Sequence, residues 1–105
     1  PTPIPTSVLT LEVRDTCNDD HTNYYRFFDT TNNLVWPSPA QVYFTPGYYT
    51  PARHGLSCIT GATICYGATS EDYNYSWGIG IDGVGGCLDC CLTCTNATYY
   101  EDMGC

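Results

Sequence analysis

Hydrophobic and polar residues alternate one by one in two segments of the chain. Leu9, Leu11 and Val13 are separated by polar side chains, and this period of two predicts a strand with one buried face over residues 7–14. The same pattern predicts a second one-sided strand over residues 75–81. The hydrophobic positions of that second strand are Tyr75, Trp77, Ile79 and Ile81.

Shorter apolar and aromatic stretches, separated by turn residues, predict the remaining strands. Pro46-Gly47 is a predicted turn, because proline presets φ and glycine accepts positive φ. Gly61-Ala62 is predicted to join its two flanking strands into a hairpin, and Asp-Thr-Thr-Asn-Asn at residues 29–33 has turn chemistry. The further predicted strands cover residues 24–28, 34–36, 41–45, 48–50, 56–60 and 63–66.

No segment has the periodicity of an amphipathic helix. We therefore expect an all-β fold, a small disulfide-stapled β-sandwich or Greek-key barrel of roughly seven or eight short strands. Residues 1–6, Pro-Thr-Pro-Ile-Pro-Thr, have the composition of an extended linker, since proline favours a semi-rigid backbone. The expected organisation is an extended N-terminal arm over residues 1–6 and a single disulfide-rich β domain over residues 7–105.

The chain is strongly acidic. It has three arginines and no lysine against eleven acidic residues, which gives a formal net charge of −8 at pH 7. Such a surface repels nucleic acid and anionic membranes, so we expect neither as a partner. No apolar run approaches the ~20 residues that cross a bilayer, so membrane insertion is not expected. We expect a secreted, extracellular chain whose export signal has been removed, or a piece cut from a longer polypeptide.

Eight cysteines in 105 residues, an even number, are typical of a disulfide framework formed in an oxidising compartment. Four of them lie in residues 86–94, Gly-Cys-Leu-Asp-Cys-Cys-Leu-Thr-Cys. Zinc, an iron–sulfur centre and a redox centre are alternatives, but zinc CxxC pairs normally lie about a dozen or more residues apart. We favour structural bridges that fasten the C-terminal segment to the sheet, with their connectivity open. The expected disulfide cysteines are Cys17, Cys58, Cys65, Cys87, Cys90, Cys91, Cys94 and Cys105.

Nothing in the sequence singles out a catalytic residue, so we expect neither enzymatic activity nor a cofactor. His21 and His54 are the only histidines, and no nucleophile elbow accompanies them. Residues 78–83 match the GxGxxG dinucleotide fingerprint, but two glycines and the cysteine cluster follow where that fingerprint needs a helix. We expect these glycines to serve close packing.

An acidic loop follows the first predicted strand. Calcium takes oxygen ligands, and Asp15, Asn18, Asp19 and Asp20 could supply them, but their spacing is not that of an EF-hand loop. The favoured interpretation is a solvated acidic loop, with a calcium site as the alternative.

Covalent glycans are expected at four positions. The sequons at Asn74 and Asn96 predict N-glycans if the producing cell has that pathway. Thr2 and Thr6 lie beside prolines, as O-glycan acceptors do in Ser/Thr/Pro-rich stalks. The alternative is that residues 1–6 are only a linker.

Pairs of adjacent aromatic residues should place one ring on each face of a strand, so some rings must be exposed. An exposed tyrosine or tryptophan can stack on a sugar ring or anchor a protein interface. The alternative is ordinary core packing with partial exposure. The candidates for sugar stacking are Trp36, Tyr48, Tyr49 and Trp77.

Two functions of different classes fit the sequence. In the first, part of the N-terminal segment leaves its own domain and completes a neighbour's sheet, which builds a head-to-tail homopolymer. The Pro/Thr arm, the small cysteine-rich β domain and the glycan acceptors resemble glycosylated, disulfide-rich subunits of extracellular fibrils, and this resemblance implies self-assembly. The residues expected to form the assembly arm are Pro1, Pro3, Ile4, Pro5, Val8, Leu9, Leu11 and Val13.

The second function is that of a carbohydrate-binding module of a secreted cell-wall-acting protein. Residues 1–6 are then a linker between modules. The aromatic candidates form the platform, and glycans are the partner.

Overall fold

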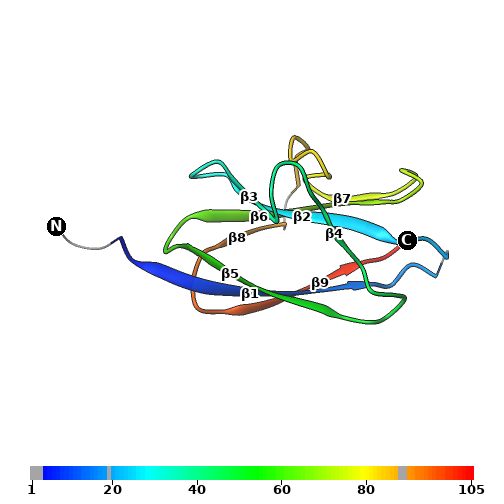
Figure 1. Ribbon diagram of the computed structural model, residues 1–105, viewed down its shortest axis with the longest axis horizontal. Helices are drawn as coiled ribbons and strands as arrows, with labels where there is room; N and C mark the ends of the chain where they lie inside the picture. Colours follow the sequence, from blue (N-terminus) through cyan, green and yellow to red (C-terminus); the bar gives the residue numbers. More distant parts are fainter. Residues whose placement is uncertain (1–3, 19, 88–89) are drawn as a thin grey trace.

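The two sheets of this protein face each other as a β-sandwich (Figure 1). The computed structural model describes residues 4–18, 20–87 and 90–105, and within them nine strands and no helix occur. The all-β expectation is confirmed, and two separate sheets favour the sandwich over the barrel. None of the described segments forms a helix with the length and hydropathy of a membrane span. The strands are β1 (Thr6–Asp15), β2 (Asn23–Asp29), β3 (Leu34–Trp36), β4 (Tyr43–Phe44), β5 (Ala52–Ile59), β6 (Thr63–Ser70), β7 (Ser76–Gly78), β8 (Cys91–Thr93) and β9 (Thr98–Met103).

The smaller sheet has the order β5-β1-β9, with β1 in the centre. β1 runs antiparallel to β5 from Thr6 to Val13 and parallel to β9 from Thr10 to Asp15. Its buried side chains alternate with more exposed ones along the whole strand, as the sequence predicts. The first four residues of β1 therefore have a strand partner on the β5 side only.

The larger sheet contains six strands but is only four strands wide. β2 and β6 pair antiparallel along the full length of β2 and form its centre. The outer edge of β2 carries first β4 and then β3, and the outer edge of β6 carries β8 and β7. Each outer strand is two or three residues long, so each covers only part of a central strand.

Side chains from both sheets interdigitate in one core. β1 supplies Leu9, Leu11 and Val13, which are almost fully buried, and β2 supplies Tyr25 and Phe27. Burying each of these side chains contributes about 1.5–3 kcal/mol relative to leaving it in water. Further core residues come from β5, β6, the cysteine segment and β9, among them Leu56, Cys58, Ile64, Cys65, Ala68, Cys94 and Met103.

The eight cysteines, all within the described residues, form four disulfides. Cys58–Cys94 and Cys65–Cys91 fasten the C-terminal cluster to β5 and β6, as expected. Cys87–Cys90 lies within the cluster itself, and Cys17–Cys105 joins the loop after β1 to the C-terminal end. The Sγ atoms of Cys87, Cys90 and Cys91 lie within 4.8 Å of one another, but a sulfur held in a disulfide offers no thiolate to a metal.

The hairpin predicted around Gly61-Ala62 is wrong. β5 and β6 do not pair with each other in the structure, because β5 belongs to the smaller sheet and β6 to the larger one. The turn carries the chain between the two layers, and it is held by hydrogen bonds from Gly61 N–H to the Cys94 carbonyl and from Cys94 N–H to the Ala62 carbonyl. The disulfide Cys58–Cys94 links β5 to the residue that follows β8.

The one-sided strand predicted over residues 75–81 ends early, at Gly78. Gly78 has a φ of +63°, and a Cβ there would lie on the Tyr66 carbonyl oxygen, so the chain turns at a position that only glycine fits. Ile79 still reaches the core, but it does so from the turn. The expected close packing holds at Gly78 and at Gly83, where a Cβ would meet the Phe28 ring, but a Cβ at Gly80 would meet no atom within 4 Å.

Two further strand predictions need correction. The strand predicted over residues 41–45 is reduced to β4, and residues 48–50 contribute only an isolated bridge between Tyr48 and Asp15. Two strands, β8 and β9, had no sequence prediction. β9 is mostly polar and exposed, and its extended form depends on pairing with β1, 88 residues earlier in the chain.

Truncating a buried side chain of β1 should be costly. We expect Leu11→Ala to lower the free energy of unfolding by about 2–5 kcal/mol, because a cavity remains between the sheets. Leu34→Ala, on an exposed strand of the larger sheet, is the matched control and should cost less than about 0.5 kcal/mol. Urea unfolding with intact disulfides measures both, and equal losses would contradict the burial of β1.

Candidate functional site

The N-terminal segment leaves the body of the sandwich at one end of its long axis, and the C-terminus lies toward the other end (Figure 1). The molecule measures 51 × 26 × 25 Å along its principal axes. Ile4 and Val8 are 68% and 51% exposed, although both are apolar. The segment thus presents hydrophobic side chains at one end of the elongated molecule.

The backbone of this segment has two different edges. The Pro5 carbonyl accepts a hydrogen bond from Thr60 N–H on the β5 side, at 3.1 Å. Because pairing groups alternate along an antiparallel strand, Thr6 N–H points to the opposite side. Val8 N–H lies on that opposite side as well, where it donates to Asn96 Oδ1 at 2.9 Å.

The prolines follow the same alternation. They occupy positions 1, 3 and 5 of the sequence, and in the described residues Pro5 lacks the N–H group that would face the β5 side. The even-numbered residues keep their N–H groups for the other edge. In the described part of the segment, Ile4 and Thr6 have no strand partner on that edge.

The disulfides leave this segment untethered. Cys17 is the first cysteine, and its bond to Cys105 encloses the rest of the chain in one covalent loop. Residues 1–16 therefore lie outside every disulfide loop of the protein. They are the part of the chain that can change partners without breaking a covalent bond.

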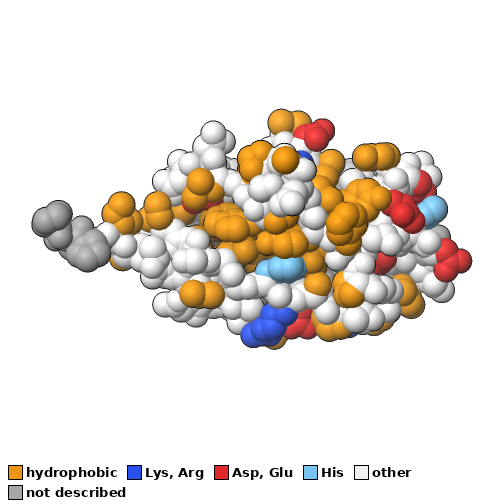
Figure 2. Space-filling view, in the orientation of Figure 1, with side chains coloured by type: hydrophobic (Ala, Val, Ile, Leu, Met, Phe, Trp, Pro, Cys, Tyr) orange, Lys and Arg blue, Asp and Glu red, His pale blue; other side chains and the backbone are white. Residues whose placement is uncertain are grey.

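One side of the sandwich exposes hydrophobic side chains across the gap between the sheets, as Figure 2 shows. His54 on β5 bridges this gap: its Nε2 lies 2.6 Å from the Tyr25 hydroxyl on β2, and its ring lies 4.1 Å from the ring of Tyr43. Desolvation by burial lowers the pKa of His54 and raises that of Tyr25. Burial therefore favours the neutral imidazole in this contact.

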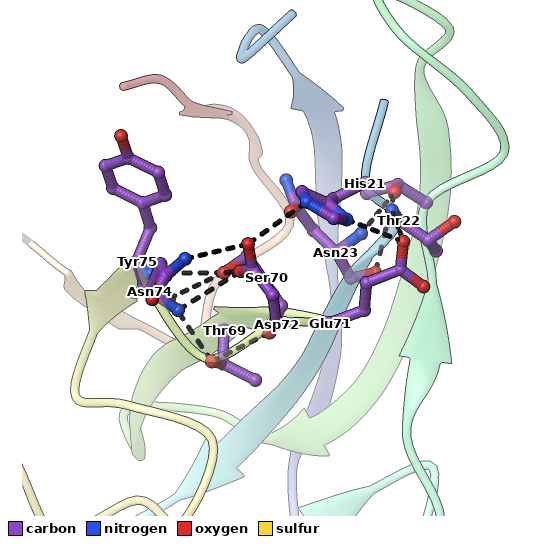
Figure 3. A network of polar contacts seen from close by, with 10 residues as sticks. His21, Thr22, Asn23, Thr69, Ser70, Glu71, Asp72, Asn74 and Tyr75 are labelled. Carbon is purple, nitrogen blue, oxygen red and sulfur yellow. Dashed lines mark hydrogen bonds and ion pairs between the residues drawn. The ribbon is translucent and has the colours of Figure 1, made fainter. Parts of the chain in front are cut away.

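A second polar cluster links the loop after β1 to the turn after β6 (Figure 3). The two ring nitrogens of His21 lie 3.1 Å from carboxylate oxygens of Glu71 and Asp72. Hydrogen bonds from Thr22 N–H and from His21 hold the pKa of Glu71 below its ordinary value. Ser70 Oγ and Asn74 N–H do the same for the pKa of Asp72. These contacts join two loops at one end of the sandwich.

The acidic loop considered for calcium lies beside this cluster. Asp15, Asn18 and Asp20 line a common recess, and Asp19 lies outside the described residues. The carboxylate of Asp15 is buried and accepts a hydrogen bond from Cys17 N–H at 2.9 Å. That carboxylate therefore holds the loop to the end of β1, so Asp15 is not part of a solvated loop as expected, whereas Asn18 and Asp20 are exposed.

The two sequons differ in their surroundings. Asn74 Nδ2, the atom that would carry a glycan, donates to Asp72 at 3.0 Å. Asn96 is exposed, and its Oδ1 accepts a hydrogen bond from Val8 N–H. Thr6 is exposed at the start of β1, and Thr2 lies outside the described residues. A glycan on Asn96 would stand next to the N-terminal segment.

The sugar-stacking candidates lie in three separate places: β3, the connection after β4, and β7. Trp36 and Trp77 are half-buried against the core. Tyr48 and Tyr49 are exposed, but they meet edge to face. No ring contact joins the three places in the parts of the chain that the structure describes.

Tyr75, absent from the candidate set, forms a stacked aromatic pair with Trp77. Tyr75 is 45% exposed, and the two rings lie 6.2 Å apart between centroids with an interplanar angle of 22°. Trp77 is fixed in turn, because its Nε1–H donates to the Gly104 carbonyl at 2.7 Å. The spacing of two between Tyr75 and Trp77, which places both on one face of a strand, was the signal for this pair.

Comparison with known proteins identifies no relative from which a function could be transferred. No protein-family model matches the chain, and neither a curated protein nor a solved structure matches it. The N-terminal segment, with its exposed apolar side chains and its untethered backbone, is the feature from which a function can be argued.

The His54 contact predicts acid sensitivity. Because the folded-state pKa of His54 lies below its unfolded value of 6.5, its stabilisation is complete above that value and is lost as pH falls through the folded-state pKa. We expect a lower free energy of unfolding at about pH 5 than at about pH 7.5, and a smaller difference in His54→Gln. Urea unfolding at both pH values measures this. An unchanged difference in His54→Gln would assign the acid sensitivity to other groups.

Proposed function

We propose that this protein is a secreted structural glycoprotein that assembles head to tail into extracellular fibrils, with its N-terminal segment completing the sheet of a neighbouring copy. The observation that carries the proposal is the covalent topology of the chain. The disulfide Cys17–Cys105 closes residues 17–105 into one covalent loop, and residues 1–16 lie outside every disulfide loop. A donated strand has to come from such an untethered segment.

The edges of the segment support donation. Its even-numbered residues can pair with a neighbour through backbone hydrogen bonds, while the prolines blunt the other edge. A donated strand of this kind pairs with another strand along one edge only. It can therefore join two copies without adding further strands side by side.

The shape of the molecule supports a linear arrangement. The segment leaves one end of the long axis, so its contact with a different surface of a second copy would be heterologous. Heterologous contacts that do not close on themselves build filaments. Leu11 and Val13 can stay in their own core, because Ile4 and Val8 provide the exposed apolar side chains of the segment.

The composition supports an extracellular setting. Four disulfides in a chain of this size are typical of an oxidising compartment. The partners are further copies of the chain and the covalent glycans at the sequons. A glycan on Asn96 would stand beside the donated segment and shield the junction between two copies.

Deleting residues 1–5 should abolish assembly and leave the domain folded, because β1 begins at Thr6 and keeps all its core side chains. Negative-stain electron microscopy of the purified protein reports fibrils, and thermal unfolding reports the fold. Ile4→Asp, which places a charge on the segment, should also prevent fibrils, whereas Ile4→Val should not. Fibrils that persist in the truncated protein would rule out the proposal.

A carbohydrate-binding module is the second candidate, and the observation that favours it is the stacked pair of Tyr75 and Trp77. Two nearly parallel rings, one of them half exposed, offer the flat apolar surface on which a sugar ring stacks. In this case residues 1–6 are a linker to another module.

Tyr75→Ala tests this candidate without disturbing the core, because the ring is half exposed. If the pair binds sugar, retention on an insoluble glycan should fall about tenfold. Tyr73→Ala, at an exposed tyrosine of the same turn, is the matched control and should leave retention unchanged. Equal retention of both variants and the native chain would exclude the stacked pair as the binding surface.

A further inference from the structure

An uncharged groove lies along the connection from β3 to β4. It has a volume of about 450 Å³, within the range of roughly 300–1,000 Å³ that is usual for ligand pockets. The groove sits at the edge of the larger sheet, since β4 pairs with β2 on one side and has no strand partner on the other among the described residues. The lining residues are Pro37, Ala40, Gln41, Val42, Tyr43 and Phe44.

The groove is preformed by Arg26, which extends from β2. Its guanidinium donates to the Gln41 carbonyl at 2.8 Å and to the Pro39 carbonyl at 3.2 Å, and a third hydrogen bond at 3.0 Å reaches the Ile81 carbonyl. These bonds fix the backbone of one wall. A preformed site loses little conformational entropy when it is occupied.

The floor of the groove offers aromatic surface to a partner. Phe44 is 60% exposed, and its ring is held by an edge-to-face contact with Tyr24 at 5.1 Å between centroids. Tyr43 is half-buried beside it and contacts His54. An exposed, immobilised aromatic side chain next to proline is typical of grooves that bind extended, proline-rich segments.

The distribution of charge favours a second copy of this chain as the occupant. Two copies, each with a formal charge of −8, repel each other over most of their surfaces. Residues 30–52, which include the whole groove lining, contain no charged side chain, and neither do residues 1–11. The N-terminal segment and the groove are thus two surfaces that can meet without opposing like charges.

The chemistry of the segment fits the groove. Prolines at positions 1, 3 and 5 favour an extended backbone, and Ile4 supplies an exposed apolar side chain. Its N–H groups at even positions can pair with the open edge of β4 while the apolar side chain packs on Phe44. We propose that the groove between Pro37 and Phe44 receives residues 1–5 of a second copy of this chain; this inference rests on the proposed assembly function.

Photo-cross-linking of the full-length chain tests the proposal. A benzophenone amino acid replaces Phe44, and heavy-isotope-labelled and unlabelled copies are mixed before irradiation. Mass spectrometry of the digest should show cross-links from position 44 to residues 1–5 that join a labelled and an unlabelled chain. Cross-links only within one chain, or to another part of the second copy, would overturn the proposal.

A groove variant provides the second measurement. Ala40→Glu places a carboxylate at the exposed surface of the groove and should reduce the cross-link to residues 1–5 about tenfold and prevent fibrils, because a docked apolar segment would strip that carboxylate of water. Ala40→Ser is the matched control in the groove. Val84→Glu adds the same charge at a highly exposed position outside it. Both controls should cross-link and assemble like the native chain.

The two proposals fail separately. Fibrils that survive Ala40→Glu but vanish when residues 1–5 are deleted overturn the groove as the acceptor and leave strand donation standing. Fibrils that survive the deletion overturn the proposed function itself. In that case the cross-link from position 44 still shows whether residues 1–5 of a second copy occupy the groove.

Discussion

The packing of β1, the central strand of the smaller sheet, against the larger sheet is the interaction on which the rest of the structure depends. Its side chains Leu9, Leu11 and Val13 meet Tyr25 and Phe27 of the opposite sheet, and its two edges hold β5 and β9 in place. Hydrophobic burial is the dominant favourable term in folding, so a strand that is both central and buried anchors one whole layer. Yet this strand belongs to the part of the chain that no disulfide encloses.

The two halves of β1 are held by different numbers of contacts. The second half of β1 is held by strands on both edges and by the core, whereas the first half has β5 on one side and only the Asn96 side chain on the other. Stability in a folded protein varies along the chain, and it is lowest where few contacts hold the backbone. The first half of β1 is thus the less tightly held half of the strand, and the second half is the more tightly held one.

The disulfides compensate for a small core. A domain of about 100 residues buries a limited share of its surface, and cross-links remove conformational freedom from the unfolded chain. Cys58–Cys94 and Cys65–Cys91 draw the glycine-rich C-terminal segment onto the two sheets. With these bridges in place, exposed tyrosines and polar loops occupy much of the remaining surface without weakening the fold.

The sequence by itself determined the fold class, the burial of Leu9, Leu11 and Val13, and the turn at residues 29–33, because these follow from neighbouring residues and strand periodicity. Only the tertiary structure decided which strands pair, that β5 and β6 lie in different sheets, and that polar β9 is a strand at all. The tertiary structure likewise decided which cysteines pair and how the Tyr75 and Trp77 rings stack. It also decided where the groove lies whose backbone Arg26 holds. The physical reason is that these contacts join residues far apart in the chain or depend on how a turn aims a side chain, and no local pattern encodes that.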